Sequence, residues 1–72
     1  MKKNKNKMLN YEIMKELVGK TAKEGELLCS QNGYIFRIVR EDKVRYIVTM
    51  DYRLDRINIR LDNGIITSCD MG

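Results

Sequence analysis

An alternating stretch near the end of the chain, "DRINIRLD" at residues 55–62, most constrains what the protein can fold into. Alternation of apolar and polar residues is typical of a β-strand with one buried face. Asp62-Asn63-Gly64 follows as a strong turn signal, and "IITSC" at 65–69 then returns as a second strand. The buried face is predicted to carry Ile57, Ile59 and Leu61, and the opposite face Arg56, Asn58 and Arg60. The hairpin therefore needs another element to cover its apolar side.

A helix at about residues 22–31 is the clearest candidate for that cover. Thr21 and Glu24 have the spacing of a capping box, in which each side chain bonds the other residue's backbone amide. Asn32-Gly33 ends the segment, and glycine there accepts the left-handed conformation that follows many helices. The residues at helical spacing that would form the buried stripe are Ala22, Gly25, Leu28 and Cys29.

The remaining segments complete one α+β domain. "YIFRIVR" at 34–40 is rich in β-branched and aromatic residues and predicts another strand. "LNYEIMKELVGK" before the helix predicts one or two helical turns or an irregular docking segment that ends at Gly19. A chain of 72 residues has room for a single domain with a thin core. We expect one helix packed on a small sheet.

The net charge of +4 belongs to the N-terminus. Four lysines lie within "MKKNKNKM", whereas the chain from Leu9 to Gly72 carries ten basic and ten acidic side chains. Residues 1–8 therefore predict a disordered basic tail, and residues 9–72 a neutral domain. A neutral domain with few aromatic residues argues against specific nucleic-acid binding.

Nothing in the chain suggests a membrane span or a signal peptide. Taken as complete, the chain predicts a cytoplasmic protein, whereas removal of a signal peptide would also allow secretion. Cys29 and Cys69 have neither zinc-site nor CxxC spacing. They are either two small buried thiols or a single disulfide, and the sequence leaves both readings open.

Enzymatic chemistry has little support in this sequence. There is no histidine, so the usual near-neutral general base is missing and histidine cannot bind a metal. The acidic residues have no metal-loop spacing, and Gly33 and Gly64 stand alone rather than in a phosphate-binding loop. We expect no enzyme activity, no cofactor and no metal.

Four segments together resemble the potato inhibitor I family of serine-protease inhibitors (eglin-like), with features of its bacterial relatives. They are "ELVGKT" at 16–21, "IVTMDYRLDR" at 47–56, "LDNGI" at 61–65 and the final Gly72. The resemblance implies a helix on a small mixed sheet with a parallel strand pair, bridged by an extended reactive loop. It also implies a serine-protease partner, subtilisin-like or chymotrypsin-like, and we expect a monomer.

Carried over by position, the resemblance makes Met50-Asp51 the reactive bond, with Met50 entering the primary pocket of the protease. An apolar, adaptable side chain suits the apolar pocket of subtilisin-like or chymotrypsin-like enzymes. The implied protease-binding loop also includes Ile47, Val48, Thr49, Tyr52 and Arg53, and the implied loop support is Arg56, Asn58 and Gly72.

Two features depart from the family pattern. Asn58 replaces a second supporting arginine, as in the bacterial relatives, and so predicts weaker support because its side chain is shorter and uncharged. The approach "VREDKVRYIVTM" is longer than usual, and its alternation from Val44 onward is strand-like. Ile35–Arg40 and Val44–Thr49 could pair as a hairpin about 41–43, which would leave Met50 at a strand end.

The sequence therefore predicts a substrate-like inhibitor that acts through the loop around Met50-Asp51. The alternative is a binding module that keeps the inhibitor fold but uses its loop or sheet edge on a partner that is not a protease.

Overall fold

The computed structural model describes residues 8–72 and has two helices and one four-stranded sheet. The elements are α1 (Asn10–Leu17), α2 (Ala22–Gln31), β1 (Ile35–Glu41), β2 (Val44–Arg45), β3 (Arg56–Asp62) and β4 (Ile65–Met71). Most of the predicted basic tail lies outside the described residues. Its last residue, Met8, donates its amide to the Asn32 side chain at 2.9 Å, and its carbonyl accepts a bond from the Tyr34 hydroxyl.

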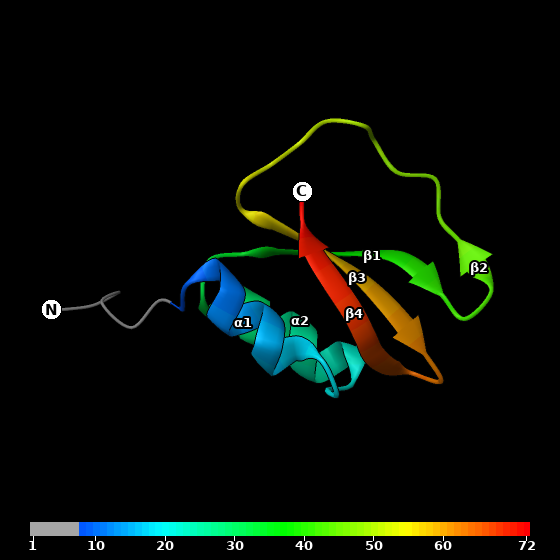
Figure 1. The fold of residues 1–72 in the computed structure, drawn as a ribbon, viewed down its shortest axis with the longest axis horizontal. Coiled ribbons are helices and arrows are strands. Elements are labelled where there is room, and N and C mark those ends of the chain that lie inside the picture. Colours follow the sequence, from blue (N-terminus) through cyan, green and yellow to red (C-terminus); the bar gives the residue numbers. More distant parts are fainter. Residues whose placement is uncertain (1–7) are drawn as a thin grey trace, which may run out of the picture.

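The sheet is mixed, with the strand order β2-β1-β3-β4. β1 runs parallel to β3, while β1 with β2 and β3 with β4 are antiparallel pairs. Figure 1 shows both helices on one side of the sheet and the connection from β2 to β3 arching away from them. The α+β class and the parallel pair are thus confirmed, but the fold has two helices where the prediction had one.

The helices begin and end where short-range contacts fix them. In α2 the Thr21 hydroxyl accepts the Glu24 amide, and the Glu24 carboxylate accepts the Thr21 amide, so the predicted capping box forms. Gly33 follows α2 with φ of +77°. The segment before α2 forms the helix α1. The Glu12 carboxylate accepts the Leu9 amide at its start, at 2.9 Å, and Gly19 follows its end with φ of +99°.

The predicted turn at 62–64 joins β3 to β4 as a two-residue hairpin. Asp62 pairs with Ile65, and both central residues, Asn63 and Gly64, have positive φ. This is the backbone pattern for which Asn-Gly is strongly preferred.

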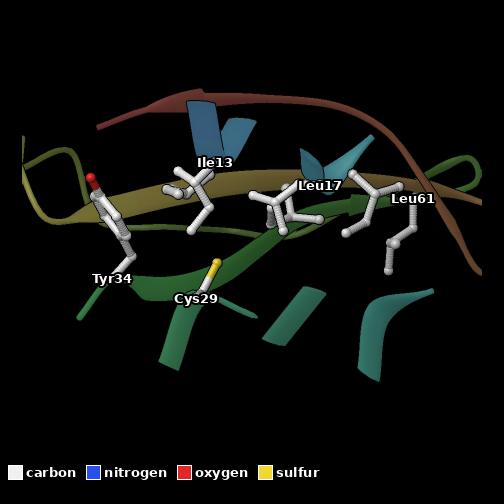
Figure 2. Packing of buried hydrophobic residues seen from close by; sticks show 8 residues of the cluster. Ile13, Leu17, Cys29, Tyr34 and Leu61 are labelled. Carbon is white, nitrogen blue, oxygen red and sulfur yellow. The ribbon is translucent and has the colours of Figure 1, made fainter. Parts of the chain in front are cut away.

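The core lies between the helices and the inner face of the sheet (Figure 2). The three apolar residues of the alternating stretch are fully buried, as predicted, while Asn58 and Arg60 on the other face are partly exposed. The buried apolar cluster is Ile13, Leu17, Cys29, Tyr34, Ile57, Ile59, Leu61 and Ile66. In the predicted stripe of α2, Gly25 and Cys29 are buried, whereas Ala22 and Leu28 are half-buried.

Both cysteines are free thiols. Burial raises the pKa of Cys29 to about 11, and it also raises the pKa of the half-buried Cys69. A high thiol pKa disfavours the reactive thiolate. The first of the two readings of the cysteines therefore describes this structure.

Within residues 8–72, neither helix has the length and apolar character needed to cross a membrane.

Candidate functional site

The site lies in the irregular segment 46–55, between β2 and β3. The hairpin, which was the alternative to an extended loop, forms only in part. Only Glu41 with Val44 and Arg40 with Arg45 pair, and the Tyr46 amide adds one bond to the Val39 carbonyl at 3.0 Å. The pairing proposed as far as Thr49 is therefore absent, and the chain leaves the sheet after Tyr46.

The side chains of this segment are presented to solvent. Ile47 is fully exposed and Met50 is 95% exposed, although both are large apolar residues. Tyr52 and Leu54 are also exposed, whereas Val48 is half-buried. A small domain rarely leaves such residues in water without use, so this run of exposed apolar side chains indicates a contact surface.

Arg56 supports the segment from the start of β3. Its side chain is almost buried, and its Nη2 donates to the Asp51 carbonyl at 2.7 Å and to the Gly72 carbonyl at 2.8 Å. The same nitrogen lies 3.6 Å from the Asp51 carboxylate. One guanidinium thus joins the residue after Met50 to the end of β4.

Gly72 is the second support. Its amide donates to the Arg56 carbonyl at 3.0 Å, and its own carbonyl also accepts the Arg53 amide at 3.2 Å. Gly72 has φ of +143°, and a Cβ there would lie 3.4 Å from the Tyr52 ring and 3.2 Å from the Asn58 amide. Glycine is favoured chiefly because side chains rarely adopt this positive φ, and a Cβ would also require a small shift of the Asn58 amide. Figure 1 shows this end of β4 beneath the arch of the connecting segment.

Thr49 and Asp51, on either side of Met50, are each bonded to an arginine of the sheet. The Thr49 hydroxyl, and after it the Arg56 guanidinium, lowers the pKa of the Asp51 carboxyl from its ordinary value. Thr49 also accepts a bond from Arg37 Nη1 at 3.2 Å. Met50 therefore lies between two anchored residues while its own side chain stays in solvent.

Arg37 also contacts this segment, and the sequence did not predict it. It lies on β1 directly opposite Asn58 of β3, and its Nε donates to the Asn58 Oδ1 at 2.9 Å. Of the three predicted support residues, Arg56 and Gly72 bond the segment directly, whereas Asn58 bonds Arg37. The sequence shows Arg37 as an arginine within the strand-like "YIFRIVR". It does not show how that strand is aligned with β3, so the contact of Arg37 with Asn58 could not be predicted.

The departing half of the segment is tied down separately. Arg53 and Asp55 form a two-bonded ion pair with both distances 3.0 Å, and Arg53 lowers the pKa of the Asp55 carboxyl. The Asp55 carbonyl accepts the Ile35 amide at 2.7 Å, which fixes the end of the segment to the start of β1.

This arrangement can present a peptide segment but holds no metal-binding cluster. Among residues 8–72 there is no group of three or more Asp, Glu, Cys or His side chains placed to hold an ion. The segment presents exposed apolar side chains on an anchored backbone, an arrangement suited to binding another molecule.

Comparison with known proteins gives no family assignment, because no family model matches the chain and no curated protein matches it.

Proposed function

We propose that this protein is a substrate-like inhibitor of serine proteases and that Met50-Asp51 is its reactive bond. The observation that carries the proposal is the exposure of Met50 between two anchored residues. Its side chain is 95% exposed, while the residues before and after it are hydrogen-bonded to arginines of the sheet. An exposed apolar side chain between two anchored residues is not expected at a strand end or in an ordinary surface loop.

Anchoring favours tight binding without rapid turnover. A flexible substrate loses conformational freedom when a protease binds it, whereas an anchored segment has lost much of that freedom already. Bonds from a cationic guanidinium to carbonyl and hydroxyl oxygens are among the stronger hydrogen bonds available for such anchoring.

The same contacts oppose completion of hydrolysis. If the Met50-Asp51 bond is cut, Thr49 remains bonded to Arg37 and the Asp51 carbonyl remains bonded to Arg56. The new carboxyl and amino ends stay close together, and rejoining them competes with release.

The chemistry of Met50 selects the class of target. A long, unbranched, apolar side chain fits an apolar primary pocket and has no charge to pair with the carboxylate of a trypsin-like pocket. Subtilisin-like and chymotrypsin-like enzymes are therefore the proposed partners, in agreement with the family that segments 16–21, 47–56 and 61–65 resemble.

Inhibition assays against subtilisin, chymotrypsin and trypsin test the proposal. The wild-type protein should inhibit the first two, and Met50→Lys should transfer inhibition to trypsin. Val44→Lys is the matched control, because it puts the same charge on an exposed apolar residue outside the reactive segment. The proposal fails if neither subtilisin nor chymotrypsin is inhibited at micromolar concentration and Met50→Lys gains nothing against trypsin.

A binding module for a non-protease partner is the second candidate. It is favoured by Val44 and Tyr46, which expose apolar surface on the edge strand β2 and just after it, before the exposed run that begins at Ile47. A partner that adds a strand at this edge would use both. Binding that is lost with Tyr46→Ala but kept with Met50→Ala would favour this candidate over the inhibitor.

A further inference from the structure

A row of polar side chains crosses the outer face of the sheet beneath the reactive segment. Arg37 of β1 lies opposite Asn58 of β3, and Asn58 lies opposite Asp70 of β4. Arg37 Nε donates to Asn58 Oδ1 at 2.9 Å, and Asn58 Nδ2 donates to Asp70 Oδ1 at 3.2 Å. The other Asp70 oxygen accepts from Arg60 Nη2 at 2.7 Å. This row, from Arg37 to Arg60, is called the outer-face row below.

We propose that Arg37 is the second loop-holding arginine of this protein and that Asn58 is the residue that aims it at Thr49. Its meaning for inhibition rests on the proposed function, but the contact itself can be tested without a protease. In this arrangement Arg56 holds the residue after Met50 from β3, and Arg37 holds the residue before it from β1.

The geometry of Arg37 suits two simultaneous bonds. Its planar guanidinium donates Nε to Asn58 and Nη1 to Thr49, so the first bond fixes the direction of the second. A lysine has one nitrogen at the end of a flexible chain and cannot reproduce this fork. The length and planarity of arginine, as well as its charge, are therefore required.

The outer-face row orients Asn58 from both ends. Its amide oxygen accepts from Arg37 and its amide nitrogen donates to Asp70, so a flipped amide would break both bonds. An arginine at position 58 would put a second cation directly opposite Arg37, and like charges in that position are destabilising. Asn58 is thus the partner that an arginine on β1 needs, which gives a physical reason for the departure at this position.

Thr49 passes the effect of Arg37 on to Asp51. The Thr49 oxygen accepts from Arg37, so its single hydroxyl proton is free to point toward Asp51, and the Thr49 side chain is the first cause of the lowered Asp51 pKa. Without Arg37 the hydroxyl can rotate and donate elsewhere. Asp51 therefore reports on a residue that it does not contact, and its pKa distinguishes positioning from a general loss of stability.

The test uses Arg37→Lys and Arg37→Gln in the full chain, with Arg45→Gln as the control. Arg45 is an arginine of the neighbouring strand β2, exposed and outside the reactive segment. The pKa of Asp51 is measured by NMR titration, cleavage at Met50-Asp51 by subtilisin is followed by intact mass, and the denaturation midpoint is recorded for each variant.

Both Arg37 variants should raise the pKa of Asp51 toward its ordinary value and accelerate cleavage by about tenfold, as expected for loss of one charge-assisted bond. Arg45→Gln should change neither. In a Thr49→Val background, Arg37→Gln should add no further change in the Asp51 pKa, since the hydroxyl that transmits the effect is gone.

Two results would overturn the inference. If Arg37→Lys behaves as wild type, the charge of residue 37 suffices and the fork has no role. If Arg45→Gln shifts the Asp51 pKa as much as Arg37→Gln, the effect is one of net charge. Absence of inhibition by the wild type refutes the proposed function alone, since the Asp51 titration still decides the role of Arg37.

Discussion

At the scale of single residues, Arg56 is the buried side chain that joins the proposed reactive segment to the end of β4. It is 7% exposed, and its Nη2 serves carbonyls that are 21 residues apart in the chain, those of Asp51 and Gly72. Its Nε has no hydrogen-bond partner among the described residues. A buried cation with one unpaired nitrogen is costly, so its bonds to the segment offset part of that cost.

Replacing Arg56 should therefore weaken the fold as well as the site. Arg56→Met keeps a long side chain but removes the Arg56 donor from the Asp51 carbonyl and leaves the Gly72 carbonyl with the Arg53 amide alone, which costs about 1–3 kcal/mol in free energy of unfolding. Chemical denaturation followed by circular dichroism measures this loss. Arg53→Gln is the control, because it breaks an exposed ion pair whose contribution is at most about 1 kcal/mol. Equal losses in the two variants would contradict the assigned role of Arg56.

Short-range contacts could be predicted from the sequence, and long-range ones could not. The capping box of Thr21 with Glu24 and the Asn63-Gly64 turn involve residues at most three positions apart, so their spacing carries the information. Arg37 bonds residues 12 and 21 positions away, which only the register of β1 with β3 brings near. Arg56 was predicted through a family resemblance, and composition or periodicity alone would have left it an ordinary strand residue.

At the scale of elements, α2 approaches the sheet closely at Gly25. A Cβ built there would lie 2.5 Å from Ile66 Cδ1 and 3.1 Å from Phe36 Cε1. The sequence predicted this glycine on the buried stripe, but the closeness of the contact depends on side chains from β1 and β4. Glycine is tolerated within the helix because it lets these side chains fill the space next to the backbone.

Gly25→Ala should consequently destabilise the protein even though alanine favours helix. The gain in helix propensity is about 1 kcal/mol, whereas overpacking costs typically 1–3 kcal/mol, and we expect a net loss of about 1 kcal/mol. Thermal or chemical denaturation measures the change. Ser30→Ala, at an exposed position of the same helix, receives the propensity gain without the clash. A stabilised Gly25→Ala variant would show that α2 is not closely packed at this point.

A polar contact also ties three strands together at the far end of the sheet. Arg40 of β1 bonds both oxygens of Asp62 of β3 at 2.9 and 3.0 Å, and Thr67 of β4 donates to the same carboxylate at 2.6 Å. The Arg40 guanidinium and then the Thr67 hydroxyl lower the pKa of Asp62 to about 2. The carboxylate form is therefore favoured by the fold.

This shift predicts a loss of stability in acid. The pKa of Asp62 is lower in the folded state than in the unfolded state, so its contribution is present above about pH 4 and is lost as the pH falls toward 2. Denaturation midpoints at several pH values between 2 and 6 should fall in acid for the wild type. Asp62→Asn should fall less steeply over the same range. Other carboxylates add to the slope in both proteins, so identical slopes would exclude a contribution from Asp62.

The strand-like alternation from Val44 to Met50 predicted a longer hairpin than the structure has. Val44 and Tyr46 are exposed, as are Ile47 and Met50, so neither face of this segment has a core to cover it. β1 also has a register shift between Ile38 and Arg40, where the pairing with β2 ends. A bulge twists a strand and commonly terminates pairing. The periodicity of the sequence shows neither the lack of a covering core nor the register shift in β1.

At the scale of the whole molecule, the proposed reactive bond divides the chain into two parts that share one core. Cleavage at Met50-Asp51 would leave both helices and β1 on one fragment and β3 with β4 on the other. The buried residues of β3 pack with Ile13 and Leu17 from the first fragment, and β1 pairs with β3 along its length. We therefore expect the fold to survive cleavage of that bond.

The cut protein should remain a single particle. After limited cleavage by subtilisin, native mass spectrometry or size-exclusion chromatography should show the two fragments associated, and denaturant should separate them. The buried apolar surface of β3 supplies the attraction, at roughly 25 cal/mol per Å². A sample cut at any other bond serves as the comparison. Fragments that separate under native conditions would rule out rejoining of the bond.

The short strand β2 also divides the connection between β1 and β3 into two loops. The bond from the Tyr46 amide to the Val39 carbonyl divides the connection 42–55 into two closed rings, one at the turn 42–43 and one at 47–55. Closing the ring 47–55 instead of the whole connection 42–55 saves only about 0.4 kcal/mol of entropy, so the effect on stability is minor. The division has a larger effect on which changes in loop length are tolerated, because the lengths of the two rings can change independently. Residues can be added to the turn without lengthening the segment that carries Met50, which makes the turn the natural place to attach a further binding element.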